Sequence, residues 1–317
     1  MQVFYSRPRF IPAFMFKTLK SIGFQAVDMH FHSEYSLDAA SSVRSSLVKC
    51  RQRGYGVAIT DHNEIRGAVK SWKQRQHVFV IPGIEASTIE GTHTLYYFYD
   101  IGLCKQFYND IIAPLKKNNP FFLPIAIDKL MDKAHRYNAV ACVAHPYGVG
   151  NIGIKKIKID GMRRVAKKFQ LAEALNGSNL RKLNRKAIAW ARHLDKGIVA
   201  GSDGHLTKEL GNALTIAYGY DIESFLHSLI ANRSALLGNE MNIFVNAIRQ
   251  IEKEKKYFHD ARKLGLGRLW VTDHVNELHK LEQKMSHSRH YIHKHARRVG
   301  LDKDAYSNYV KLRFGGF

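Results

Sequence analysis

A regular alternation of short, β-rich apolar runs with helical patterns extends from about residue 26 to residue 220 and limits the folds open to this chain. The runs are AVDMHFH, GVAITDH, VFVIPGIE, ACVAHP, LAEAL and GIVAGSDGH. Helix-like segments such as SSVRSSLVKCRQRG and LRKLNRKAIAWARHLDKG lie between several of them, and each closes on a glycine that suits a helix C-terminus. This alternation predicts a parallel α/β architecture, most simply a barrel.

Potential metal ligands collect where the predicted strands end. In order they are His30 and His32, Asp61 and His62, Glu85, His145, and finally Asp203 and His205. The run LAEAL ends in no such residue, although it carries Glu173 and leads to Asn176. Because functional groups of a parallel barrel gather at the C-terminal ends of its strands, these side chains are expected to meet.

The residue types favour a catalytic metal centre over a structural one. Imidazole and carboxylate together suit Zn²⁺, Mn²⁺ or Fe²⁺, and the sequence does not choose among these ions. A structural zinc ion needs four ligands in a closed shell, and the strand ends supply more than that. A centre of two or three metal ions accounts for the excess.

The motifs DMHFHS, ITDHN, GIE, AHP and GSDGH, in this order, resemble the signature of the PHP family, named for polymerase and histidinol phosphatase. The resemblance covers roughly residues 26–220. It implies a distorted (β/α)7 TIM-like barrel with a di- or trinuclear metal centre, in which a metal-activated hydroxide hydrolyses phosphate esters.

The same resemblance assigns roles to individual residues. His30, His32, Glu85 and Asp203 would hold one metal; Glu85, His93 and His145 a second; and Asp38, His62 and His205 a third. Among them Glu85, Asp203 and His205 are the expected catalytic residues. Asp38 departs from the family pattern because Ala39 follows it where relatives carry glycine.

Further residues are expected around this centre. Asp28 and Asp61 would orient histidines through hydrogen bonds, with capping of the next helix as the alternative for Asp61. Substrate contacts are expected from Asn63, Asn176, Arg181 and Ser202. Loop capping is the competing interpretation for Asn63, Asn176 and Ser202, and a solvated helix position for Arg181.

Charge and the pattern of apolar residues divide the chain into three predicted parts. They are an N-terminal arm (1–25), a metallophosphoesterase domain (26–224) and a basic, mostly helical C-terminal region (225–317). Residues 231–317 contain 17 Lys or Arg against 9 Asp or Glu, and the whole chain carries a formal charge of +22 with a pI near 9.9. Such a surface attracts polyanions, unless the charge only reflects a basic proteome.

The predicted function is hydrolysis of phosphoester bonds, with nucleotides or nucleic-acid ends as substrates. Two alternatives stay open: a small-molecule phosphatase of the histidinol-phosphatase type, and a non-catalytic nucleic-acid-binding module. Three scattered cysteines, no signal peptide and no apolar run of 18 residues predict a cytoplasmic protein without a membrane span. The oligomeric state is left undetermined.

Overall fold

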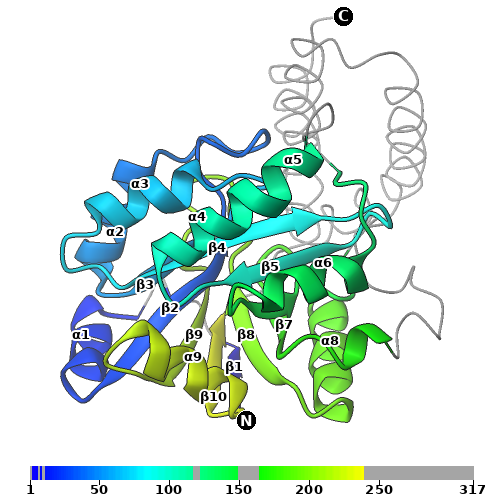
Figure 1. The fold of residues 1–317 in the computed structure, drawn as a ribbon. Coiled ribbons are helices and arrows are strands. Elements are labelled where there is room, and N and C mark those ends of the chain that lie inside the picture. Colours follow the sequence, from blue (N-terminus) through cyan, green and yellow to red (C-terminus); the bar gives the residue numbers. More distant parts are fainter. Residues whose placement is uncertain (1, 6–7, 9–10, 117–121, 149–163, 239–317) are drawn as a thin grey trace, which may run out of the picture. The chain divides into compact units, whose positions relative to one another are not determined.

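The computed structural model describes residues 2–5, 8, 11–116, 122–148 and 164–238 (Figure 1). Most of the predicted C-terminal region, from residue 239 onward, lies outside the described residues, and so does the predicted helical character of that part. None of the described helices has the length and apolar character needed to cross a bilayer.

One sheet organises the described part of the chain, with its strands in the order β1-β10-β9-β2-β3-β4-β5-β6-β7-β8. The strands are β1 (Gln2–Tyr5), β2 (Phe24–Phe31), β3 (Gly56–Ile59), β4 (Val80–Ser87), β5 (His93–Tyr97), β6 (Val140–Val143), β7 (Leu171–Asn176), β8 (Gly197–Gly201), β9 (Ala213–Tyr218) and β10 (Ser234–Gly238). All six runs predicted as strands are present as β2, β3, β4, β6, β7 and β8.

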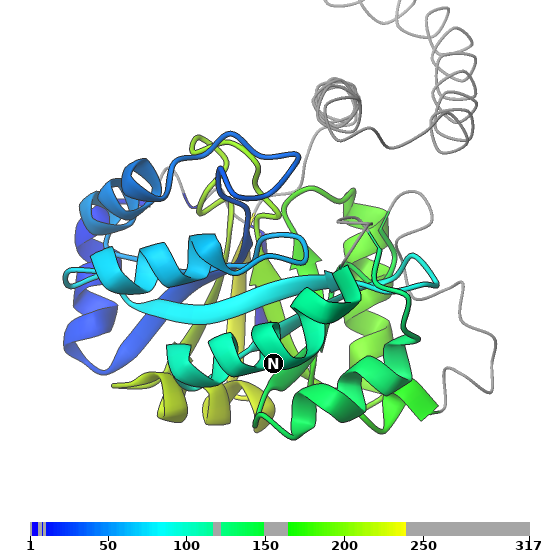
Figure 2. The same cartoon turned by 45° about the horizontal axis from the view of Figure 1, so that its top comes forward.

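Strands β2 to β8 curl into a barrel-like arrangement (Figures 1 and 2). Pairing is parallel from β2 to β4 and from β6 to β8, whereas β5 runs antiparallel to both of its neighbours. The segment after β8 bonds back to β2: the Asp203 amide donates to the His30 carbonyl (2.7 Å), and the His32 amide donates to the Gly204 carbonyl (2.9 Å). The predicted distorted barrel is therefore confirmed, with β5 as its principal irregularity.

Three further strands extend the sheet beyond this curl. β9 pairs antiparallel with β2 and β10, and β1 pairs parallel with β10. β1 belongs to the predicted arm and β10 to the predicted C-terminal region, so the sheet includes residues outside 26–224. Their short apolar runs lack the polar residues that marked the other strand ends, which is why sequence patterns did not reveal them. The domain boundaries stay predictions.

Helices cover the outside of the sheet (Figures 1 and 2). They are α1 (Ala13–Ser21), α2 (Val43–Arg53), α3 (Arg66–Gln74), α4 (Ile101–Phe107), a π-helical turn (Tyr108–Ile112), α5 (Ala113–Lys116), α6 (Ile127–His135), α8 (Arg181–His193) and α9 (Ile222–Ile230).

Only one of the two glycines expected at helix ends has that role. Gly54 ends α2 with φ 83°, the left-handed conformation that glycine adopts without strain. The prediction for Gly197 is wrong, because α8 already ends at His193 and Gly197 begins β8. A Cβ at Gly197 would meet the Leu229 carbonyl oxygen, so close approach of α9 explains this glycine.

The interior of the curled sheet is apolar at one end. Val27, Met29, Ala58 and Val199 form a buried cluster there with Leu229 of α9. Phe225 and Leu226 of α9 belong to the same cluster. Since α9 closes this end, polar side chains can gather only at the other end, where the parallel strands terminate.

β8 approaches β2 closely at Gly201, and a substitution there tests this approach. A Cβ at Gly201 would meet the His30 Cβ and would lie 2.6 Å from the His30 amide nitrogen. Gly201→Ala is expected to lower the free energy of unfolding in urea by about 1–3 kcal/mol through overpacking.

Gly102→Ala is the matched control, because its Cβ would meet only the exposed Asp100 carboxylate, at 2.8 Å. That variant is expected to unfold close to the wild-type midpoint. Equal urea midpoints for the two variants would contradict the close approach.

Candidate metal centre

The structure brings all nine predicted metal ligands into one cluster of contacting side chains at the C-terminal ends of the parallel strands. These residues are His30, His32, Asp38, His62, Glu85, His93, His145, Asp203 and His205. Within it, three groups each offer one ligand atom per residue with all atoms within 4.8 Å of one another: His32, Asp38, His62 and His205; His30, His32 and Glu85; and His62, Glu85 and His93.

The Glu85 carboxylate occupies the middle of the cluster and is completely buried. Its Oε2 lies 3.2 Å from His30 Nε2, 3.3 Å from His32 Nε2 and 3.0 Å from His62 Nδ1. Its other oxygen, Oε1, lies 2.9 Å from His93 Nδ1 and 3.2 Å from His145 Nε2. One carboxylate thus contacts five imidazoles.

Several of these buried atoms lack hydrogen bonds although they lie close together. Glu85 Oε2 and His62 Nδ1 have no hydrogen-bond partner, while His30 Nε2 and His32 Nε2 face each other at 3.1 Å. Buried polar atoms are normally hydrogen-bonded, and converging nitrogen and oxygen lone pairs are what a divalent cation binds. The donor set therefore fits a metal centre.

The orientation of two histidines agrees with this interpretation. The Asp203 carbonyl oxygen can only accept, so His205 Nδ1, 3.0 Å away, carries the hydrogen and His205 Nε2 points at Asp38 Oδ2 (2.7 Å). Likewise, His30 Nδ1 faces Glu173 Oε1 at 3.1 Å, which leaves His30 Nε2 directed into the cluster. A carboxylate behind a ligating histidine fixes its ring and raises its basicity.

Strong electrostatic coupling follows from this crowding. Burial opposes ionisation, yet His30, His62 and His93 hold the pKa of Glu85 well below its usual value. Burial likewise disfavours charge on His30, but Glu85, Glu173 and Asp203 raise its pKa well above normal. At His93 burial prevails and lowers the pKa to about 4, so this ring is neutral and able to bind metal at neutral pH.

Glu173 is a supporting residue that the sequence analysis noted on its strand but did not place in the site. Besides the His30 ring, its carboxylate accepts from the His145 amide (2.7 Å) and from Asn176 Nδ2 (3.0 Å). It is almost fully buried. The only signal in the sequence was a glutamate inside an apolar strand, where an unpaired carboxylate would be costly.

The hydrogen bonds expected from Asp28 and Asp61 to histidine rings are not among those of the described residues. Asp28 accepts from the amides of His30 (3.3 Å), Ser202 (2.8 Å) and Gly211 (2.7 Å), which ties β2 to the segments around β8. Asp61 accepts from both the amide and the hydroxyl of Ser33. Both aspartates therefore position backbone, and Asp61 does not cap α3, whose N-cap residue is Ile65.

Most of the residues expected to touch substrate have structural partners. The Asn63 amide donates to the Glu85 carbonyl, and Asn63 Oδ1 accepts from the Ser87 amide. Asn176 Nδ2 lies 3.4 Å from Asp203 Oδ2, and Ser202 Oγ donates to the His30 carbonyl (3.3 Å). All three are buried, whereas Arg181 begins α8 and is exposed.

Three of the eight non-glycine residues with positive φ in the described part of the chain lie at these strand ends. Asn63, His145 and Asp203 adopt positive φ angles of 49°, 24° and 49°. Non-glycine residues rarely adopt such angles, and strain of this kind clusters at functional sites. At these three positions the angles turn the chain sharply where each strand ends.

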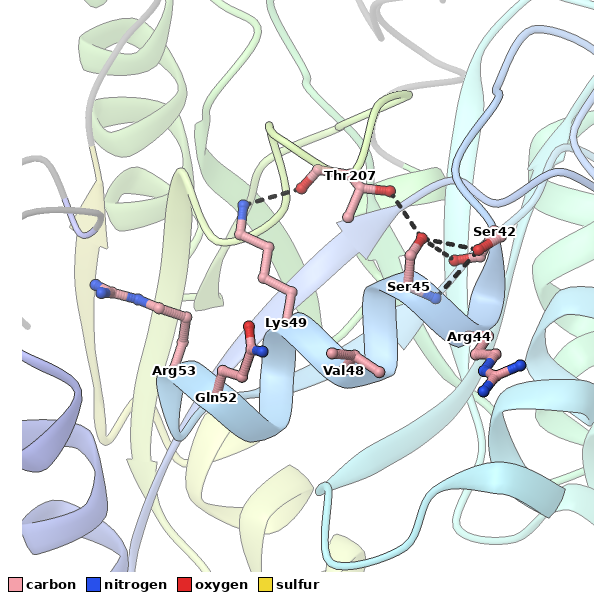
Figure 3. Close-up of a pocket in the computed structure, with 8 residues that line it drawn as sticks. All are labelled: Ser42, Arg44, Ser45, Val48, Lys49, Gln52, Arg53 and Thr207. Atoms are coloured by element: carbon pink, nitrogen blue, oxygen red, sulfur yellow. Dashed lines mark hydrogen bonds between the residues drawn. The ribbon is translucent and has the colours of Figure 1, made fainter.

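A surface pocket beside the cluster has a different character (Figure 3). It is lined by Ser42, Arg44, Ser45, Val48, Lys49, Gln52, Arg53 and Thr207. The Lys49 ammonium donates to the carbonyls of Thr207 (2.9 Å) and Lys208 (3.1 Å), so α2 braces the segment that carries His205. The residues that line this pocket are not among the candidate metal ligands, but Lys49 holds in place the segment that follows His205.

Comparison with known proteins adds a family segment and a set of similar folds. A family model described as PHP-associated matches residues 181–234. No curated protein matches the sequence.

Several solved structures share the fold at low sequence identity. A two-domain protein from Bacteroides vulgatus that contains a predicted PHP-like metal-dependent phosphoesterase has a TM-score of 0.54 and 14% identity, over 74% of this chain and 70% of that one. Endonuclease Q in complex with a 27-mer duplex substrate bearing an abasic lesion has a TM-score of 0.56 and 15% identity, over 68% and 60%. The Pyrococcus furiosus enzyme PfuEndoQ has a TM-score of 0.52 and 15% identity, over 67% and 57%.

Metal binding is expected to stabilise the protein through Glu85. With Mn²⁺ or Zn²⁺ at about 100 times its dissociation constant, chelator-treated wild type should gain about 2.7 kcal/mol, seen as a rise in Tm. Glu85→Gln removes the central carboxylate and should show a smaller rise, because only the group His32, Asp38, His62 and His205 keeps all its ligands. Glu223→Gln, at an exposed position of α9, is the control that should respond like wild type. A full rise in Glu85→Gln would refute the assignment.

Asp28 should give a pH-dependent contribution to stability. Burial raises its pKa from 3.8 to about 6 against the opposing hydrogen bonds of Ser202, Gly211 and His30. Because the folded pKa lies above the unfolded one, this contribution is greatest at low pH and is lost as the pH rises through about 6. The difference in unfolding free energy between chelator-treated wild type and Asp28→Asn should therefore fall by about 1 kcal/mol or more from pH 5 to pH 8. A difference independent of pH would contradict it.

Proposed function

We propose that this chain, whose resemblance to the PHP family is supported by its PHP-associated segment and its fold, is a metal-dependent phosphoesterase. The observation that carries the proposal is the buried Glu85 carboxylate, which contacts five imidazoles and has an oxygen without a hydrogen bond. Divalent metals bound there would neutralise phosphate oxygens and lower the pKa of a water molecule toward neutrality.

The exposure of the cluster suggests how a substrate reaches it. His30, His32 and Glu85 are inaccessible, whereas the side chains of His62 and Asp203 are 19% and 13% exposed. A phosphate group would approach from this rim. Asp203 and His205 would then contact the reacting groups, and Glu85 would hold the centre together from below.

We propose that His205 acts on the leaving group through a metal ion. Its ring is fixed at both nitrogens by the Asp203 carbonyl and the Asp38 carboxylate. A ring fixed in this way would hold a metal ion at Nε2 without reorganising, and that ion would stabilise the charge on a leaving oxygen.

Nucleotides or nucleic-acid ends are the proposed substrates. The formal charge of +22 favours polyanions. Endonuclease Q, which shares the fold, has been captured with a DNA duplex. A cytoplasmic location belongs to the same proposal and agrees with free, buried Cys50, Cys104 and Cys142.

Release of phosphate or of a cleaved strand would test this function directly. The substrates are a 5′-phosphorylated oligonucleotide, a nucleoside 3′,5′-bisphosphate and histidinol phosphate, each with Mn²⁺, Zn²⁺ or Fe²⁺. Asp203→Asn should lower kcat/KM by at least about 100-fold if its carboxylate acts on the reacting groups.

Asp195→Asn is the matched control, because Asp195 has the same φ of 49° and is exposed. It should retain wild-type activity. Turnover of histidinol phosphate alone would favour the small-molecule phosphatase. No turnover by a metal-loaded protein that still binds nucleic acid would favour the non-catalytic module.

A further inference from the structure

Helix α8 carries a cationic face that the metal centre does not use. Its sequence, RKLNRKAIAWARH, contains no Asp or Glu. At 100° per residue its exposed positions fall within an arc of about 140°. Apart from Ala189 they are all basic or potentially basic: Arg181, Lys182, Arg185, Lys186, Arg192 and His193.

Four of these charges, on Lys182, Arg185, Lys186 and Arg192, have no ion-pair partner within the described part of the chain. The lysine and arginine ion pairs found there use other residues, namely Arg66, Lys70, Lys116, Arg164 and Lys168. Lys182, Arg185, Lys186 and Arg192 therefore remain available to an external anion. Exposed cations at such density repel one another, and bound phosphates would relieve that repulsion.

Hydrogen bonds link the N-terminal end of α8 to the candidate metal centre. Asn184 exchanges two hydrogen bonds with the backbone of Asn176, and Asn176 Nδ2 lies 3.4 Å from Asp203 Oδ2. Just before the helix, Ser178 Oγ donates to the Asp203 carbonyl (3.1 Å). The N-terminal end of α8 therefore lies close to the rim residue Asp203, and the helix runs along the outer side of the sheet beside β7 (Figure 1).

We propose that the exposed face of α8 is a track for the phosphate backbone of a nucleic-acid strand whose scissile phosphoester lies at the metal centre. This inference rests on the proposed function and narrows it from phosphate esters in general to a polymeric strand. Thirteen residues make a helix of about 20 Å, roughly the length of six phosphates of one strand at 3.4 Å spacing.

A membrane surface is the competing polyanion, and the helix lacks what binding to it would require. A helix that lies in a bilayer interface exposes large apolar side chains beside its charges. The apolar positions of α8, such as Ile188 and Ala191, pack inward, and no α8 residue is among the exposed large hydrophobic side chains of the described part.

Salt-dependent binding of a fluorescent 20-nucleotide single strand would test the track. The full-length chain is used with EDTA, so that binding is measured without hydrolysis. In the variant Lys182→Gln, Arg185→Gln, Lys186→Gln and Arg192→Gln, the slope of log K against log salt should become less steep by about 3, at about 0.7 per lost phosphate contact. Affinity in low salt should fall at least about tenfold.

The matched control also removes four positive charges, but from exposed positions of α1, α2 and α3. Its substitutions are Lys17→Gln, Arg44→Gln, Arg51→Gln and Lys73→Gln. Its slope should stay close to that of wild type. Thermal melting establishes that both variants are folded.

Equal salt slopes for the two variants would refute the proposed track on α8. DNA binding would then depend only on the overall positive charge of the chain. Loss of binding to phosphatidylglycerol vesicles with unchanged DNA binding would overturn it in favour of a membrane surface. Because no metal is present, the comparison is independent of hydrolysis. Failure of the proposed phosphoesterase activity would therefore be seen separately, as a metal-loaded wild type that turns over no substrate.

Discussion

The burial of one carboxylate among imidazoles is the constraint on which the rest of this structure depends. Glu85 is inaccessible to water and has five histidine nitrogens within 3.3 Å. Removing such a charge from water is expensive unless opposite charges or a metal compensate for it. The strand ends around Glu85 are arranged so that this compensation is possible. His30 and His32 come from the end of β2, and His62, His93 and His145 each come from a separate segment.

The surroundings of the cluster fix its members through the backbone more than through the rings. Asp28 and Asp61 bind amides and a hydroxyl, while Glu173 holds both the His30 ring and the His145 amide. Positive φ angles at Asn63, His145 and Asp203 direct the chain sharply at three strand ends. A rigid frame of this kind keeps the ligand atoms close together against their mutual repulsion.

The polar cluster and the basic helix α8 belong to one functional surface in this interpretation. The apolar cluster closed by α9 leaves only the C-terminal ends of the strands open to polar groups. The first turns of α8 are bonded to Asn176, which contacts Asp203. Chemistry at the centre and recognition of the polyanion along α8 would then be coupled through a few hydrogen bonds.

The sequence by itself determined the strand–helix alternation, six strands of the curled sheet and the nine residues that meet at its open end. It could do so because parallel strands place their terminal residues at one edge, so local patterns have a long-range consequence. Only the tertiary structure decided what depends on pairing between distant segments. The strands β1, β9 and β10, the role of Gly197 beside Leu229 and the partners of Asp28, Asp61 and Glu173 all follow from such pairing. No local periodicity encodes these contacts, because each is made between residues far apart in the chain.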